Sequence, residues 1–203
     1  MYISRRRMCH MTIDSAVMAG VTQVRQGVAE KFSFVRDLGR VQVPRSWGRN
    51  VNYDDLRILC SPVASKWDDR INGSTFRRAR HEFCSERRYT VELYEPVNPG
   101  SATTYQDSLD FLASQGGLFV GVPGLVLLMT ERQERFKNTF SEGESITMPD
   151  LPNKLWTDYR TNAKFVPSFT MMSGRFVVEL QDSADTWAPQ QYLPLIREFV
   201  RKQ

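Results

Sequence analysis

The sequence predicts an α+β fold, a mostly antiparallel sheet of about five strands with helices packed on at least one face. Residues 89–95 alternate apolar and polar side chains, as half-buried strands do, and residues 104–114 place apolar side chains three and four positions apart, as helices do. With 203 residues and 41% hydrophobic content, the chain can also bury a core. We expect one domain over residues 12–203, preceded by a basic N-terminal arm over residues 1–11.

The first part of the chain is expected to be mostly helical. Residues 13–37 predict a long amphipathic helix, because their apolar residues recur every three or four positions. A short strand is expected at residues 41–43, before a proline. Three shorter helices follow in this interpretation: one capped by Asn52, one beginning at Ser61, and one over residues 76–85.

The middle of the chain combines clear and ambiguous patterns. Residues 89–95 predict a strand, and residues 104–114 predict a helix. Residues 118–121 and 125–129 are apolar and flank a Val-Pro-Gly sequence, so we expect two strands there, the second of them central in the sheet. The charged stretch 131–138 is expected to extend as a solvated helix.

The last third of the chain contains the clearest hairpin. Residues 165–172 and 175–181 are both strand-like, and Ser-Gly at the join is typical of a tight turn. A short helix is expected to begin at Asp150 and a C-terminal helix at Pro194, since proline is favoured in a first helical turn.

Two features bear on cellular location. Residues 111–130 carry no charge and are long enough to cross a bilayer, but glycines and a proline interrupt them, so we expect buried structure and no membrane span. The chain has three cysteines, which is poor material for a disulfide framework. A reducing compartment such as the cytoplasm is therefore expected.

Sequence motifs of common enzymes are absent. There is no phosphate-binding loop, zinc-hydrolase motif, nucleophile elbow or Cys-x-x-Cys pair, and we expect no cofactor. Two histidines lie near cysteines, which leaves open a zinc site or a thiol nucleophile with a histidine base, formed by Cys9, His10, His81 and Cys84. The competing interpretation is that Cys60 and Cys84 are small buried hydrophobic residues and that His81 is a surface residue among arginines.

Carboxylates occur in close pairs at four places, Asp54/Asp55, Asp68/Asp69, Glu142/Glu144 and Asp182/Asp185. A hydrolase that uses two acids needs both in one cleft, which spacing alone does not establish. Solvated surface charge is the simpler interpretation of all four pairs.

Charge is distributed unevenly along the chain. Residues 1–90 contain 17 Lys and Arg against 9 Asp and Glu, a net charge of +8, whereas residues 91–203 contain 10 against 14, a net charge of −4. Of the cations, 21 are arginines, which bind carboxylates and phosphates through a planar fork of N–H donors. The basic part of the chain is therefore expected to bind an anionic partner.

Three clusters hold the arginines most suited to partner binding. One lies in the arm, a second flanks a tryptophan, and a third is interleaved with Phe76, Phe83 and Tyr89. Arginines beside aromatic residues suit protein interfaces, and they also suit phosphate contacts combined with base stacking. The predicted partner-binding residues are Arg5, Arg6, Arg7, Arg45, Trp47, Arg49, Arg77, Arg78, Arg80, Arg87 and Arg88.

Three classes of function follow from these patterns. The leading hypothesis is a non-enzymatic structural component of a larger assembly, for example a virus or phage particle, in which the Arg-rich region binds acidic surface on the same or another protein subunit. The alternatives are a nucleic-acid-binding protein that uses the same arginines and an enzyme of unknown type.

Overall fold

The computed structural model describes residues 30–47, 50–71, 79–80, 82–98, 103–131, 140–150, 156–158, 160–185 and 187–200. Three helices lie in these ranges: α2 (Tyr53–Cys60), α3 (Tyr105–Ser114) and α4 (Gly121–Glu131). The strands are β1 (Phe32–Gln42), β2 (Asn50–Val51), β3 (Ala64–Trp67), β4 (Ala79–Arg80), β5 (Arg88–Pro96), β6 (Ser145–Thr147), β7 (Trp156–Thr157), β8 (Lys164–Met172), β9 (Arg175–Asp182) and β10 (Gln191–Glu198).

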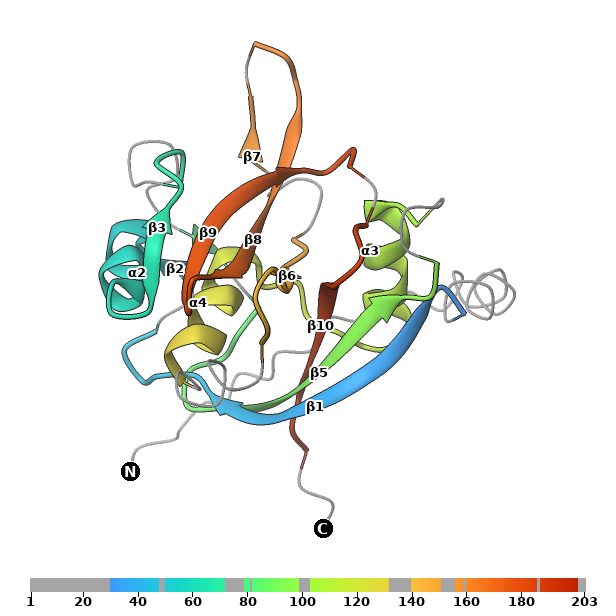
Figure 1. Cartoon of the computed structure of the whole chain (residues 1–203). Helices are drawn as coiled ribbons and strands as arrows, with labels where there is room; N and C mark the ends of the chain where they lie inside the picture. The colour runs from blue at the N-terminus through green and yellow to red at the C-terminus, as the bar shows by residue number, and fades with distance from the viewer. Residues whose placement is uncertain are drawn as a thin grey trace.

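Eight of these strands form one curved sheet (Figure 1). Its order is β1-β5-β10-β6-β8-β9-β3, and β7 pairs with β8 beside this path. The β10–β6 and β9–β3 pairs are parallel and the other pairs are antiparallel. The predicted α+β class and mostly antiparallel sheet are therefore confirmed, with more strands than expected.

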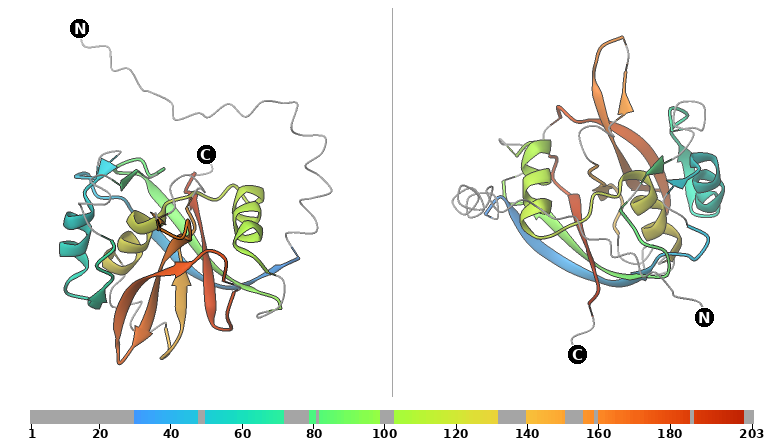
Figure 2. Two further views of the ribbon diagram at one scale, coloured as in Figure 1. Left: turned by 90° about the horizontal axis from the view of Figure 1, so that it is seen from above. Right: turned by 180° about the vertical axis from the view of Figure 1, so that it is seen from behind.

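Helices cover both faces of the sheet (Figure 2). On the concave side, α4 is buried from Gly121 to Met129 and belongs to the main hydrophobic cluster together with α2. On the other face, α3 packs against β10 in a second cluster that includes Phe111, Leu193 and Leu195. Strand β10 is thus buried on both faces over six consecutive residues.

Local sequence signals explain two of the three helices. Asn52 accepts a hydrogen bond from the backbone of Asp54 and caps α2. Thr104 and Asp107 form a reciprocal capping box at the start of α3. Both predicted helices, the strand at residues 89–95 and the hairpin between β8 and β9 are confirmed.

The predicted helix over residues 13–37 is wrong from Glu30 onward, where a turn leads into β1 at Phe32, and residues 13–29 lie outside the described residues. Strand β1 has register shifts against β5 at two places, each placing an extra residue in β1. The buried residues Leu38 and Val41 therefore stand three apart, and this spacing imitates a helical pattern.

Two further helix predictions are also wrong. The segment after Ser61 forms β3, which pairs in parallel with β9, and Trp67 donates its indole N–H to the carbonyl of Ile71 at 2.8 Å. The segment containing Pro194 is strand β10, whose burial on both faces removes the alternation by which a strand is recognised.

The two strands predicted at residues 118–121 and 125–129 are replaced by one helix, α4. A helix buried all round has no polar face, so periodicity does not separate it from a buried strand. Pro123 is in its first turn, where no intrahelical N–H bond is lost. None of the described helices is long and apolar enough to cross a membrane.

Three other helix predictions fall partly or mostly outside the described ranges, and the described residues 82–85 of the first are not helical. Within residues 76–85, Ala79–Arg80 is strand β4 and not helix. Of the helix predicted at residues 131–138, only Glu131 is described, as the last residue of α4. The segment that follows Asp150 is described again from Trp156–Thr157, which is strand β7.

Candidate functional site

Strand pairing brings two of the predicted arginine clusters together. The end of β1 pairs with the start of β5, so that Gln42 lies opposite Arg88. The backbone of Val43 donates a hydrogen bond to the carbonyl of Arg87 at 3.1 Å, and this places the loop that carries Arg45 beside the residues that precede β5. We call Arg45, Arg87 and Arg88 the basic edge.

The ion pairs that the described residues form at the basic edge are exposed. Arg45 lies 3.8 Å from Glu86, with side chains 87% and 63% exposed, and Arg87 lies 3.0 Å from Glu198, with side chains 66% and 45% exposed. Arg88 is exposed and forms no ion pair within the described ranges. Exposed pairs contribute about 0–1 kcal/mol, so carboxylates of a partner can replace them at little cost.

Other arginines have structural roles that sequence reasoning missed. Arg36 contacts Glu144 at 3.3 Å and lies over the ring of Phe140. Arg70 binds Asp68 at 2.7 Å and lies over the ring of Phe165. Burial alone would raise the pKa of Asp68, but hydrogen bonds from Arg70 outweigh it and lower that pKa.

The aromatic residues predicted beside the arginines lie in the core. Trp47, Phe83 and Tyr89 are at most 5% exposed, and the rings of Phe83 and Tyr89 pack with centroids 5.0 Å apart. The Tyr89 hydroxyl accepts a hydrogen bond from the backbone of Cys84, and burial raises the pKa of Tyr89 to about 12. These three rings are therefore not available to stack with nucleic-acid bases.

The remaining predicted partner-binding residues are less defined. The backbone of Arg80 pairs with Asn50 across β4 and β2, which places β4 close to the loop of Arg45. The other members of the set, together with Phe76, lie outside the described residues: Arg5, Arg6, Arg7, Arg49, Arg77 and Arg78.

The histidine and cysteine hypothesis gains little support. Cys9, His10 and His81 lie outside the described residues, and Cys84 is partly buried. Cys60 is fully buried, and burial raises its pKa to about 12, so its thiol stays protonated. In the part of the chain that the structure covers, no three His, Cys, Asp or Glu residues are placed to hold a metal ion.

Three of the four acid pairs have individual structural contacts. Asp54 and Asp55 lie in the first turn of α2, where carboxylates interact favourably with the helix dipole. Asp68 binds Arg70, as described above. Glu142 accepts hydrogen bonds from the backbone of Ser173, and Glu144 accepts one from the hydroxyl of Tyr192.

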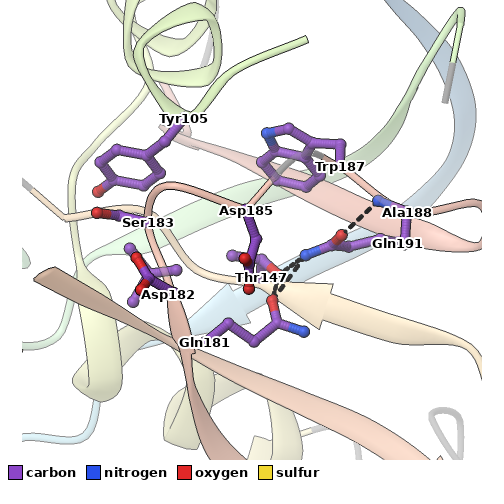
Figure 3. Close-up of a pocket in the computed structure, with 10 residues that line it drawn as sticks. Tyr105, Thr147, Gln181, Asp182, Ser183, Asp185, Trp187, Ala188 and Gln191 are labelled. Atoms are coloured by element: carbon purple, nitrogen blue, oxygen red, sulfur yellow. Dashed lines mark hydrogen bonds between the residues drawn. The ribbon is translucent and has the colours of Figure 1, made fainter. Parts of the chain in front are cut away.

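The fourth acid pair borders a pocket of about 340 Å³ between α3, the sheet and the β9–β10 loop (Figure 3). Tyr105 and Trp187 lie along one side and Gln181 along the other, with Asp182 and Asp185 between them (Figure 3). The described residues that line it are Tyr105, Thr147, Val166, Gln181, Asp182, Ser183, Asp185, Trp187, Ala188 and Gln191.

A hydrogen-bonded network forms one wall of the pocket. The side-chain amide of Gln191 donates to the Thr147 hydroxyl at 2.6 Å and to the Gln181 oxygen at 2.7 Å, and the Thr147 hydroxyl lies 3.0 Å from the same oxygen. The Gln191 oxygen accepts from the backbone of Ala188 at 2.8 Å. These bonds join β6, β9 and β10, and they fix the side chains before any ligand arrives.

The opposite wall is also fixed. The Tyr105 hydroxyl donates to the carbonyl of Asp150 and accepts from its backbone N–H at 3.0 Å. Burial raises the pKa of Tyr105, so the hydroxyl remains neutral. Trp187 is buried in the second hydrophobic cluster, where its ring meets that of Phe32 edge to face.

The pocket has a negative electrostatic character. Two carboxylates and no lysine or arginine occur among the ten lining residues that the structure describes. Asp182 accepts a hydrogen bond from the backbone of Ala184, and neither Asp182 nor Asp185 forms an ion pair within the described part of the chain. The arrangement favours a cationic ligand over an anionic one.

A second pocket, of about 360 Å³, lies between α2 and the loop of Arg45. Trp47 and Val51 line it, and Ile58 and Leu59 stand exposed at its border. Its described lining contains one carboxylate, Asp55, and is more apolar than that of the pocket between α3 and the sheet.

Comparisons with known proteins give no relative for this chain: no family model, curated protein sequence or solved structure matches it. The functional argument therefore rests on the basic edge and on the negatively charged pocket.

Proposed function

We propose that this protein is a non-enzymatic structural component of a larger assembly and that its Arg-rich N-terminal region binds acidic surface on a neighbouring copy. The observation that carries the proposal is the basic edge, where Arg45 comes close to Arg87 and Arg88 from a distant part of the sequence, and where the ion pairs of Arg45 and Arg87 with described residues are exposed. A virus or phage particle would supply such neighbours.

The two charged regions lie at opposite ends of one strand. Glu198, which pairs with Arg87, ends β10, and Gln191, in the wall of the acidic pocket, begins it. Seven residue steps in a strand span about 23 Å. Complementary surfaces at opposite ends favour head-to-tail contact, which builds rings or filaments rather than a closed two-fold dimer.

Protein contact is favoured over nucleic acid by the position of the aromatic side chains. Binding of single strands combines basic residues with exposed rings on which bases stack. Here Trp47, Phe83 and Tyr89 lie in the core, and Glu86 and Glu198 lie within the basic edge, where they would repel phosphate. A mixed surface of this kind suits a protein partner that offers both charges.

Light scattering after size-exclusion chromatography tests the proposal, at about 50 mM and about 500 mM salt, because salt screens exposed charges. The wild-type chain is expected to elute as oligomers at low salt and as a monomer at high salt. The variant Arg45→Ala/Arg87→Ala/Arg88→Ala is expected to be monomeric at both.

A matched control removes three exposed cations elsewhere, in Lys66→Ala/Arg160→Ala/Lys164→Ala. This control is expected to associate like the wild-type protein, since the net charge of the two triple variants is the same. A wild-type chain that stays monomeric at low salt contradicts the proposal, and so does equal loss of association in both variants.

A further inference from the structure

Within this molecule, guanidinium groups are held repeatedly by the same pair of partners, a carboxylate and an aromatic ring. Arg70 lies between Asp68 and the ring of Phe165, with its central carbon 4.7 Å from the ring centre. Arg36 is held in the same way by Glu144 and by two rings, those of Phe140 and Tyr192, at 4.8 and 5.2 Å. Cation–π attraction adds to the ion pair in such sites.

The pocket between α3 and the β9–β10 loop offers these partners without an arginine. Asp182 and Asp185 supply carboxylates, and Tyr105 and Trp187 supply aromatic rings at its side (Figure 3). At about 340 Å³, the pocket has room for one long side chain and lies at the small end of the range for ligand sites.

A buried hydroxyl lies on the sheet face beside the pocket. Ser168 is fully buried, and its Oγ makes no hydrogen bond to any described residue. Ser168 pairs with Thr147 across β6 and β8 and stands two residues from Val166, so it faces the same side of the sheet as these two lining residues, although it is not itself among the described lining residues. An unpartnered buried hydroxyl is costly, so this sheet face retains unmet hydrogen-bonding capacity next to the pocket.

We propose that this pocket is a guanidinium-binding site and that its occupant is an arginine from the Arg5–Arg7 arm of a second copy of the chain. This inference rests on the proposed head-to-tail association and names its acceptor. The arm suits the site because it carries three consecutive arginines and no acid before Asp14. Arg45 and Arg87, by contrast, would first have to exchange their own exposed carboxylate partners.

Isothermal titration with a synthetic peptide of residues 1–11 tests the acceptor directly. The peptide is expected to bind the full-length chain at about 50 mM salt, and Asp182→Asn/Asp185→Asn is expected to weaken binding at least about tenfold. Asparagine at 182 keeps the acceptor for the Ala184 backbone, so folding is expected to be retained, and the melting temperature verifies this. Asp185→Asn alone, at an exposed position, serves if the double variant unfolds.

Two controls separate specific recognition from net charge. Asp55→Asn/Glu131→Gln removes two exposed acids that do not line the pocket, one on α2 and one at the end of α4, and is expected to leave peptide affinity within about twofold. A peptide with lysine at positions 5–7 keeps its charge but loses the planar fork, and it is expected to bind at least about fivefold more weakly than the arginine peptide.

The oligomer measurement distinguishes failure of this site from failure of the proposed function. If wild-type protein associates at low salt and Asp182→Asn/Asp185→Asn associates equally, the pocket is not the acceptor although head-to-tail assembly stands. If the peptide binds only to an Arg5→Ala/Arg6→Ala/Arg7→Ala chain, the pocket is already filled by the arm of its own chain, and the second-copy occupant is wrong. If wild-type protein is monomeric and binds no peptide, both proposals fail.

Mixing the two deficient chains gives a further decisive result. Arg5→Ala/Arg6→Ala/Arg7→Ala retains the acceptor, and Asp182→Asn/Asp185→Asn retains the donor. Each is expected to be monomeric alone, and an equimolar mixture is expected to give dimers and nothing larger, because only one productive contact can form. A mixture that stays monomeric, or that forms the full range of wild-type oligomers, overturns the assignment.

Discussion

Replacing Gln191 with leucine tests whether the pocket wall is a preorganised network. Gln191 is 7% exposed and makes three hydrogen bonds, to Thr147 at 2.6 Å, to Gln181 at 2.7 Å and from the Ala188 backbone at 2.8 Å. Each such bond contributes about 0.5–1.5 kcal/mol net, so their loss costs about 3 kcal/mol. Burial of the leucine side chain offsets about 1 kcal/mol of this.

The expected net loss for Gln191→Leu is therefore about 2 kcal/mol in the free energy of unfolding. For a chain of this length each kcal/mol corresponds to about 2–4 °C, which gives a fall of about 4–8 °C in melting temperature. Urea unfolding followed by circular dichroism measures the free energy, and an unchanged m-value shows that the unfolded state is the same. Gln42→Leu, on the exposed side of β1, is the matched control and is expected to change stability by less than about 0.5 kcal/mol.

A double-mutant cycle with Thr147→Val makes this prediction specific to the network. Because Thr147 and Gln191 share a hydrogen bond and a common partner in Gln181, their effects are expected to be non-additive by about 1 kcal/mol. Strict additivity, or a loss below about 0.5 kcal/mol for Gln191→Leu, would refute the preorganised wall. Loss of the network is also expected to reduce affinity for the arginine peptide, since the side chains of the pocket wall would then have to become ordered on binding, at a cost in conformational entropy.

Two other substitutions test how the fold positions the pocket. Gly121→Ala is expected to destabilise the protein by more than about 2 kcal/mol in thermal melts, because Gly121 has a φ of +47° and an added Cβ would meet the Asp150 carboxylate. Gly174→Ala is the control: Gly174 has a φ of +71°, but an added Cβ would enter open space, so the expected loss is only about 1 kcal/mol. Asp68→Asn is expected to cost about 1–3 kcal/mol at pH 7, since hydrogen bonds from Arg70 outweigh burial and lower the Asp68 pKa. Such a carboxylate stabilises the fold above its ordinary pKa of about 4 and loses that contribution as the pH falls, so the difference from wild type should shrink below about pH 4; a constant difference would contradict the assignment.

Helix caps and the tight hairpin were predictable because their signals are local. Asn52 and Thr104 each satisfy backbone donors within three residues, and the Ser173-Gly174 turn sets the register of β8 and β9 without help from distant segments. Such elements form wherever the short sequence allows them, so the pattern and the structure agree.

Elements whose character depends on distant contacts were not predictable in the same way. Strand β1 shows buried residues three apart because of register shifts against β5, which lies about fifty residues later in the chain. Helix α4 and strand β10 are apolar or buried on every side, and a uniformly buried segment carries no period that identifies its backbone. For α4 and β10, burial on every side removed the alternation of apolar and polar residues on which the prediction depended.

The candidate site also has one part that could be predicted from sequence and one that could not. The arginine clusters could be found from sequence because charge is visible in composition, and the β1–β5 register then brings Arg45 and Arg87 to one edge. The acidic pocket could not be found, because Thr147, Gln181 and Gln191 stand on strands where polar residues normally indicate a solvated face. Only the pairing of β6, β8 and β9 reveals that this polar face is buried, with Ser168 at 0% exposure.

Buried polar residues on a sheet face destabilise the fold unless each has a hydrogen-bond partner. A ligand that supplies missing partners is therefore favoured at such a face. Thr147 and Gln191 offset this destabilisation through their mutual hydrogen bond. Among the described residues, Ser168 has no hydrogen-bond partner, and the carboxylates of Asp182 and Asp185 form no ion pair. In the same molecule, Arg70 and Arg36 complete two sites of similar composition. A guanidinium supplied from another copy would complete the third, and it would convert the uneven charge of the sequence into a directional contact between subunits.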